Sequence, residues 1–369
     1  MTRDIKTLSE DELSEIFQEL GEPKYRAKQL YEWLHNRNAS TYDEMTNLPK
    51  LLREKLSQEW PLSGIRIYDK RVSTDGTRKY IFELDDGVLV EAVGIPAIRD
   101  TSDTYADESA GDNLAGFAER LTVCFSTQAG CQMRCAFCAT GKGGFTRNLT
   151  SSEIVDQITA VKEDFAKDAS ESNELRVNNV VAMGQGEPFL NYEELIEALR
   201  RINNDPVLGI GARSITVSTC GIIDGVYRFA DEPEQYRLAI SLHSADQETR
   251  NQIMPALANQ PLKRLKEALL DYNLQRNRRI TLEYMMIDGV NDGQEDLSKL
   301  IKFCEGLICH VNLIPMNLVD GTSYKSSTDR HIHNWENSLK DAGIPVSIRY
   351  SKGSDIAGAC GQLVNSISD

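Results

Sequence analysis

Three cysteines close together in the sequence restrict the possible fold and chemistry of this chain more than any other feature. Cys131, Cys135 and Cys138 form a C-x3-C-x2-C triplet. Three thiolates at this spacing suit a [4Fe-4S] cluster that is bound through three of its irons and keeps the fourth iron open. An open iron can bind the amino and carboxylate groups of S-adenosylmethionine (SAM), and one electron can then break the carbon–sulfur bond of SAM. The triplet therefore predicts radical chemistry.

A structural zinc site is the main alternative interpretation of the triplet. Structural zinc usually takes four ligands, commonly from two C-x2-C pairs or from a Cys2His2 set. The chain has no second cysteine pair near the triplet, and the nearest histidines, His35 and His243, are far away in the sequence. The residues therefore favour the cluster, and zinc stays as the alternative.

The composition is that of a folded protein that is not exported. A chain of 369 residues with 40% hydrophobic residues can form one large domain and a smaller companion. The start of the chain carries no apolar run, and no segment has the length needed to cross a bilayer. We therefore expect a cytoplasmic monomer without membrane contact, whose eight cysteines are ligands, nucleophiles or buried side chains.

The net charge argues against a nucleic acid partner, whereas two local groups of basic residues argue for one. With 41 Lys and Arg against 56 Asp and Glu, the formal charge is -15, which repels phosphates at long range. Basic residues gather at 24–28 and at 142–147. Such groups bind RNA or form ordinary solvated surfaces, and the sequence leaves both interpretations open.

The first 96 residues have the pattern of a small α+β domain. A capping box at Ser9 begins a helical unit that extends to about residue 60. Two Asp-Gly turns then mark hairpins with strand-like runs at 79–84 and 88–93. Glu91 falls on an otherwise apolar strand face, where a carboxylate indicates either an exposed edge or a catalytic base.

The rest of the chain has the alternating pattern of an α/β protein. Residues 97–120 are rich in Asp, Ser, Thr and Gly, and we expect an acidic linker there. From 121 to 352, short apolar strands alternate with helices about six times, which predicts a partial (β/α)6 barrel with one open side. We expect residues 353–369 to form a C-terminal catalytic loop that carries Cys360. The barrel strands are expected to begin at Leu121, Val177, Ser214, Arg237, Ile280 and Val311.

Functional residues of parallel βα folds collect at the carboxyl ends of the strands. The triplet follows the first barrel strand, as this rule requires. Further candidates for cofactor binding occur at the ends of later strands, and for each of them a local turn or cap role fits the residues equally well. These candidates are Gly186, Glu187, Ser218, Ser241, Leu242, His243 and Asn317.

Two further cysteines differ in what their surroundings indicate. Cys124 lies within the first barrel strand, where a cysteine is usually a small apolar side chain. Cys360 lies in a glycine-flanked loop and has no evident packing role. An exposed thiol of this kind is a candidate nucleophile.

Together these residues resemble the RlmN family, radical SAM RNA methyltransferases that modify carbon 2 of an adenine. The resemblance covers nearly the whole chain. Gln185 departs from it, because the family motif usually has an apolar residue there, and Phe189 stands where a smaller aliphatic residue is common. The resemblance is carried by the triplet and by CFSTQ at 124–128, GGFTRNL at 143–149, GEP at 186–188, SLH at 241–243, NLIPMN at 312–317 and ACGQL at 359–363.

The resemblance implies a division of labour among the candidates. It implies that the N-terminal domain of this chain contacts RNA and that the triplet holds one [4Fe-4S] cluster to which SAM binds. Cys360 accepts a methyl group from one SAM, and a second SAM is cleaved so that its radical activates that methyl for addition to adenine. Glu91 takes the adenine proton, and Cys124 forms a transient disulfide with Cys360 that releases the product. The strand-end candidates bind SAM.

The resemblance also implies the partners. The RNA substrates are an adenosine in the peptidyl transferase centre of 23S rRNA and the adenosine next to the anticodon of certain tRNAs, and an electron donor such as flavodoxin or ferredoxin supplies the electron. Two alternatives remain: a sister enzyme that methylates carbon 8 of the adenine, and a non-catalytic zinc-stabilised RNA-binding protein.

Overall fold

The computed structural model describes most of the chain. The expected acidic linker lies almost wholly outside the described residues, and so does the end of the C-terminal loop. Within the described part, no helix combines the length and the apolar character needed to span a membrane. The described residues are 4–35, 37, 39, 41–62, 64–97, 120–168, 176–204 and 208–363.

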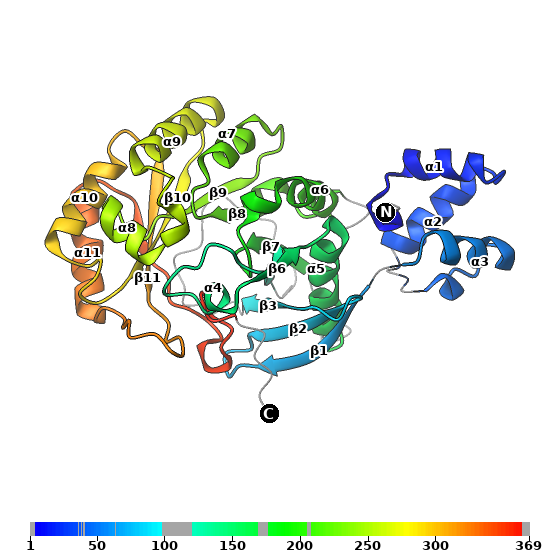
Figure 1. The fold of residues 1–369 in the computed structure, drawn as a ribbon, viewed down its shortest axis with the longest axis horizontal. Helices are drawn as coiled ribbons and strands as arrows, with labels where there is room; N and C mark the ends of the chain where they lie inside the picture. The colour runs from blue at the N-terminus through cyan, green and yellow to red at the C-terminus, as the bar shows by residue number, and fades with distance from the viewer. Residues whose placement is uncertain are drawn as a thin grey trace, which may run out of the picture.

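The N-terminal helices form a unit with its own core. The expected capping box begins α1 (Glu10–Glu19), because the Ser9 side chain accepts a hydrogen bond from the backbone N–H of Glu12. Helices α2 (Tyr25–His35) and α3 (Lys50–Glu59) complete the unit. Its apolar side chains, among them Phe17, form a separate hydrophobic cluster. Figure 1 shows the three helices to one side of the sheet.

One ten-stranded sheet dominates the rest of the described chain. Its first three strands are antiparallel, and β3 also pairs antiparallel with β4. From β4 onward the neighbours are parallel. The strands in sheet order are β1 (Ile65–Val72), β2 (Arg78–Leu84), β3 (Leu89–Ala97), β4 (Arg120–Cys124), β7 (Arg176–Ala182), β8 (Ile215–Thr219), β9 (Arg237–Ser241), β10 (Ile280–Met286), β11 (Cys309–Pro315) and β12 (Val346–Ile348).

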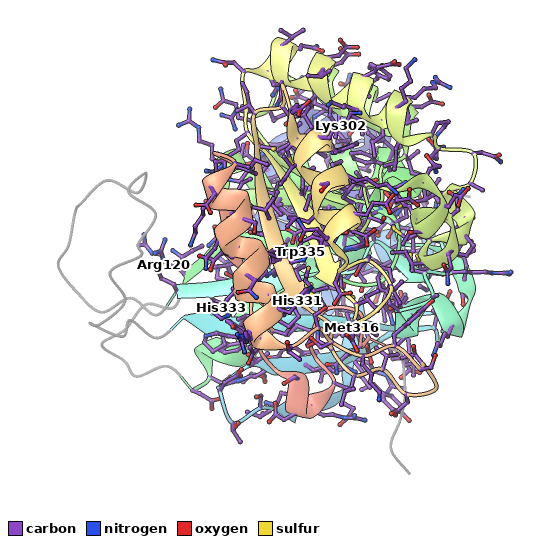
Figure 2. The ribbon with its side chains drawn as sticks, turned by 90° about the vertical axis from the view of Figure 1, so that its left-hand side faces the viewer. Arg120, Lys302, Met316, His331, His333 and Trp335 are labelled. Atoms are coloured by element: carbon purple, nitrogen blue, oxygen red, sulfur yellow. The ribbon has the colours of Figure 1, made fainter. Side chains whose placement is uncertain are left out.

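Helices cover the outer face of the parallel strands (Figure 1). They pack through apolar side chains; Trp335, for example, is buried with its ring centroid 5.4 Å from that of Tyr284, and Figure 2 labels it on the last helix. The expected α/β fold with a partial barrel is confirmed, and β12 adds a short strand at the end of the parallel series. The helices are α5 (Ser151–Ala166), α6 (Tyr192–Asn203), α7 (Ile223–Asp231), α8 (Gln247–Ile253), α9 (Leu262–Arg276), α10 (Gln294–Cys304) and α11 (Asp329–Asp341).

The hairpin strands β1 to β3 differ from the expected division at residue 96. We expected them to form one domain with the N-terminal helices, but they extend the barrel sheet instead. Tyr80, Phe82 and Val90 lie in the same hydrophobic core as the barrel. The physical reason is that an isolated hairpin cannot bury a face, whereas the edge of β4 offers it unpaired backbone groups. Strand β1 had no apolar pattern in the sequence because most of its residues are exposed.

Gly94 allows α5 to lie directly on β3. A methyl group on Gly94 would overlap the Phe165 ring and would lie 2.8 Å from Val161 Cγ1. We therefore predict that Gly94→Ala lowers the free energy of unfolding by about 1–3 kcal/mol, the usual cost of overpacking a core. Urea denaturation measures this. Gly211→Ala is the matched control, because a methyl there meets no atom within 4 Å, and an equal loss in both variants would contradict the packing argument.

Candidate active site

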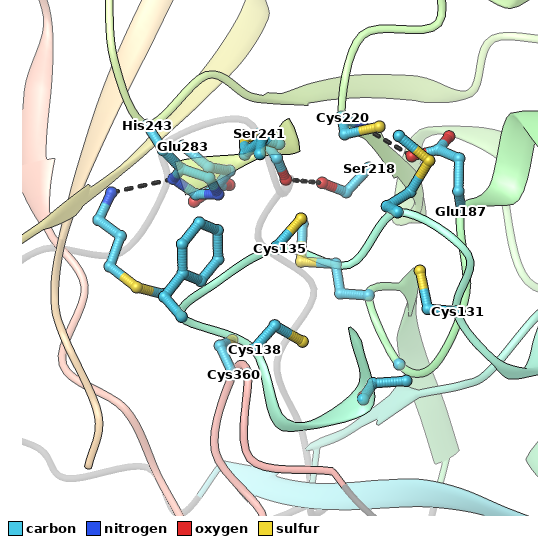
Figure 3. A pocket seen from close by; sticks show the side chains of 18 of the residues that line it. Cys131, Cys135, Cys138, Glu187, Ser218, Cys220, Ser241, His243, Glu283 and Cys360 are labelled. Atoms are coloured by element: carbon cyan, nitrogen blue, oxygen red, sulfur yellow. Dashed lines mark hydrogen bonds between the residues drawn. The ribbon is translucent and has the colours of Figure 1, made fainter. Parts of the chain in front are cut away.

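A cavity of about 150 Å³ opens at the carboxyl ends of the parallel strands. We call it the triplet cavity, because Cys131, Cys135 and Cys138 line it, as Figure 3 shows. The structure thus brings most of the predicted residues to one place. The other predicted residues that line this cavity are Gly186, Glu187, Ser218, Ser241, His243 and Cys360.

Backbone hydrogen bonds fix the loop that carries the triplet. The N–H of Cys131 donates to the carbonyl of Gly144 at 2.7 Å, beside the short ribbon of β5 (Gln128–Gly130) and β6 (Phe145–Asn148). The N–H of Ala136 donates to Ile253 of α8 at 2.9 Å, and the N–H of Ala139 donates to Gly361 at 2.7 Å. Three separate elements therefore hold the loop.

The donor set and its surroundings fit an iron–sulfur cluster. Within the described residues, no group of three His, Cys, Asp or Glu side chains is arranged to hold a single metal ion, which a zinc site requires. Cluster ligands need no common centre, because each thiolate binds a different iron. Methionines and Phe137 surround the triplet, and burial raises the pKa of Cys131 to about 11, with the charge of Cys138 adding to the effect.

Glu187 is the acidic side chain of the Gly-rich turn after β7. Its carboxylate accepts hydrogen bonds from the Thr219 hydroxyl at 2.6 Å and from the backbone N–H of Cys220 at 2.8 Å. The backbone N–H of Phe189 donates to it at 3.0 Å. Burial raises the pKa of Glu187, and these hydrogen bonds oppose the increase. The chain itself thus fixes the carboxylate at the cavity wall.

His243 lies at the end of β9 in a left-handed backbone conformation, with φ of 53°. Its Nδ1 accepts a hydrogen bond from the backbone N–H of Met285 at 3.1 Å, so a neutral ring carries its proton on Nε2. Burial lowers the pKa of His243 to about 3, and the ring is neutral at physiological pH. Its neighbour Leu242 does not line the cavity, because its side chain is buried in the core.

Asn317 holds the C-terminal loop, here residues 353–363, rather than the wall of the triplet cavity. Its side-chain amide donates to the carbonyl of Cys360 at 3.0 Å and to the Ser351 hydroxyl at 2.9 Å. The Thr140 hydroxyl donates to the carbonyl of Leu363 at 2.6 Å. The loop is therefore fastened to the barrel on both sides of Cys360.

Cys124 and Cys360 both line a second cavity of about 250 Å³, which we call the thiol-pair cavity. Both are free thiols, and Arg349 lines the cavity with them. Burial raises the pKa of Cys124 to about 12; a charge on Cys360 raises it further, and Arg349 opposes both effects. Negative charge on Cys360 and on Glu283 raises the pKa of Arg349. Sequence reasoning missed Arg349, although its place just after the last strand was a usable signal.

Glu91 is fully buried, so the exposed-edge interpretation of its position is wrong. Lys79, which is also buried, forms an ion pair with Glu91 Oε1 at 2.9 Å. The ammonium group also donates to the carbonyl of Ala357 in the C-terminal loop at 3.1 Å. Ile81 pairs with Glu91 across the strands, which makes Lys79 a diagonal neighbour. Lys79 thus links the candidate base to the loop of the candidate nucleophile.

Comparisons with known proteins give matches over nearly the whole chain. The family model described as "Ribosomal RNA large subunit methyltransferase N-terminal domain" matches residues 3–61, and the "Radical SAM superfamily" model matches residues 125–304. A relative from Thermoanaerobacter sp. (strain X514), "Probable dual-specificity RNA methyltransferase RlmN", is 40% identical over 360 residues, which is 97% of each chain. A protein of the same name from Staphylococcus aureus (strain JH9) is 42% identical over 97% of this chain and 92% of its own.

A solved structure has a similar fold over nearly the same length. It is described as a radical SAM methyltransferase from Sphaerobacter thermophilus and superposes with a TM-score of 0.85 at 37% sequence identity. The match covers 97% of this chain and 98% of that one.

Lys79→Met should lower the free energy of unfolding by about 3–5 kcal/mol, because it leaves the Glu91 carboxylate buried without the Lys79 cation. The double variant Lys79→Met/Glu91→Leu removes both charges and should regain most of that loss. Urea denaturation of the three proteins measures the difference. A double variant no more stable than Lys79→Met would show that the pair is not held by charge compensation.

Proposed function

The chain belongs to the RlmN family of radical SAM RNA methyltransferases, and from this membership we propose that it methylates carbon 2 of an adenine in RNA. The observation that supports this most directly is the position of Cys360. This thiol lines the triplet cavity on one side and shares the thiol-pair cavity with Cys124 on the other. A group that must first take up a methyl and later be released by a second thiol needs access to both places.

The radical SAM family uses an iron–sulfur cluster and SAM. We propose that Cys131, Cys135 and Cys138 hold one [4Fe-4S] cluster with one open iron, and that two SAM molecules are used per turnover. When bound, the cluster and SAM supply a radical that can remove hydrogen from an unactivated carbon. The proposed SAM contacts are Gly186, Glu187, Ser218, Ser241 and His243, which line the triplet cavity. The other two expected contacts, Leu242 and Asn317, do not line it, and Asn317 holds the loop of Cys360 instead.

The chemistry of the substrate explains the need for a thiol. Carbon 2 of adenine lies between two nitrogens and is electron-poor, so it does not attack a methyl cation donor. The Cys360 thiolate instead attacks the methyl group of SAM: a new sulfur–carbon bond forms, the bond between the methyl and the sulfonium sulfur breaks, and S-adenosylhomocysteine leaves with the electron pair. The methyl on Cys360 is the carbon that is later carried to the base. Arg349 lies beside the two thiols and stabilises negative charge on them.

Two other side chains complete the transfer. After the Cys360-borne carbon has joined carbon 2, the adduct would return one electron to the oxidised iron–sulfur cluster, and Glu91 accepts the proton of carbon 2. The Cys124 thiolate then attacks Cys360 Sγ, so that a sulfur–sulfur bond forms while the sulfur–carbon bond breaks and its electron pair takes up a proton. External reduction restores both thiols. Lys79 keeps Glu91 in place through the ion pair described above.

The proposed substrates are 23S rRNA and tRNA, in which a loop base can be unstacked and presented to a pocket. We propose that the N-terminal helical unit contacts the RNA, that a flavodoxin or ferredoxin delivers the electron, and that the protein acts as a monomer in the cytoplasm. None of the reported relatives favours carbon-8 methylation or a zinc-stabilised binding protein.

The reconstituted protein should produce 2-methyladenosine in 23S rRNA, and Cys360→Ala should lower the yield by at least about a thousandfold, because the carrier of the methyl is lost. Mass analysis of digested RNA against 2-methyl- and 8-methyladenosine standards measures the product. Iron and sulfide contents equal to those of the unmodified protein show that the variant keeps its cluster. The 8-methyl product, or full activity of Cys360→Ala, would refute the proposal.

Cys124→Ala should leave the first half of the reaction intact and block release. The variant is expected to accumulate RNA covalently joined to Cys360, because no second thiol can break the sulfur–carbon bond. Denaturing gel electrophoresis with labelled RNA detects the joined species. Cys220→Ala is the matched control, since Cys220 is buried next to the triplet and lines the triplet cavity but not the thiol-pair cavity. Free methylated RNA formed by Cys124→Ala at the normal rate would exclude a releasing role for Cys124.

A further inference from the structure

Arg250 is a fully buried cation behind the triplet loop. It belongs to α8, and its side chain is the largest among the fully buried ones in the described chain. Its Nε donates to the carbonyl of Leu242 at 3.2 Å, and its Nη2 donates to the carbonyl of Cys220 at 2.5 Å. Both partners are neutral backbone groups at the ends of neighbouring strands.

Among the described residues, the positive charge of Arg250 is only partly compensated. Its Nη1 is buried and has no hydrogen-bond partner among the described residues. Burial lowers the pKa of Arg250, against the opposing effect of the Cys220 and Cys135 thiols and of the Glu187 carboxylate. Glu187 already accepts hydrogen bonds from Thr219 and from backbone groups. A buried cation in this position is costly unless an anion faces it.

The triplet loop is fixed relative to this charge. The backbone N–H of Ala136, next to Cys135, donates to Ile253 in the same short helix as Arg250. Apolar side chains, including Ile253 and Met254, fill the space around the triplet. Electrostatic interactions are stronger in such surroundings than in water, so a fixed cation there acts strongly on any charge at the triplet.

We propose that Arg250 is the buried countercharge of the iron–sulfur cluster and raises its reduction potential. This rests on the proposed cluster at the triplet. Three thiolates outweigh the double positive charge of an oxidised core, so the occupied site is anionic, and one added electron makes it more so. Arg250 stabilises the more negative state more strongly and thereby favours reduction. It does not line the triplet cavity, and it is therefore a positioning residue, not a catalytic one.

A purely structural role of Arg250 makes a different prediction. If its purpose were to bridge the carbonyls of Leu242 and Cys220, Lys would be a poor replacement, because an ammonium group on a shorter side chain does not reproduce the guanidinium fork. Gln would replace Arg250 at least as well as Lys in this role, since its amide can keep one of these hydrogen bonds. If the positive charge sets the reduction potential of the cluster, Lys at position 250 preserves that potential and Gln does not.

The test is a redox titration of the cluster, followed by electron paramagnetic resonance, in reconstituted full-length protein. In Arg250→Gln the reduction equilibrium should shift at least about tenfold toward the oxidised cluster, which corresponds to about 59 mV for one electron. Arg250→Lys should stay within about threefold of the unmodified protein. Arg201→Gln is the matched control, because Arg201 is a partly buried cation on α6 whose pKa responds to the carboxylates of Asp156 and Asp4 and not to the triplet. The reduction potential of the cluster in Arg201→Gln should equal that in the unmodified protein.

The outcomes separate the possibilities. An unchanged potential in cluster-loaded Arg250→Gln, or an equal fall in Arg250→Lys, would overturn the countercharge role. If Arg250→Gln holds no cluster, the Lys variant decides: loading at a near-normal potential supports the role, and failure to load refutes it. Iron and sulfide contents are measured alongside each titration. An unmodified protein without a cluster would instead refute the proposed function itself.

Discussion

Three backbone hydrogen bonds hold the triplet loop, and the rest of the site depends on them. The loop is fastened to a two-stranded ribbon, to α8 and to the C-terminal loop through the N–H groups of Cys131, Ala136 and Ala139. Main-chain groups must find partners when they are buried, so these contacts define where the thiols stand without using any side chain. Because the C-terminal loop is one of the three attachments, the same bonds also bring Cys360 to the cavity.

The site also contains several charged side chains that are buried in the protein. The pair of Lys79 and Glu91, the carboxylate of Glu187 and the guanidinium of Arg250 are all shielded from water. Each would be costly in isolation, and each is held by hydrogen bonds or by an opposite charge. Such groups need little rearrangement when charge changes during a reaction, because their positions are fixed in advance. The site therefore combines an apolar lining with a few polar groups of fixed orientation.

The sequence predicted the features that depend on local pattern. The triplet, the alternating strands and the strand-end residues such as Ser241 were found because short-range spacing and the rule for carboxyl ends determine them. It missed features that depend on contacts between distant segments. Arg250 sits in a short polar helix that no sequence pattern singled out, and the position of Lys79 beside Glu91 follows only from the hairpin register. The attachment of the hairpin to β4 likewise required the three-dimensional sheet.

The turn between β1 and β2 also holds the C-terminal loop. The Ser73 hydroxyl donates to Asp355 at 2.6 Å, and the backbone N–H of Gly353 donates to Asp75 at 3.0 Å, across 282 and 278 positions of sequence. Closing a chain segment of that length costs more entropy than forming one βα unit. We therefore expect the local βα units of the barrel to form before the contacts of Ser73 and Asp75 close the C-terminal loop over its mouth.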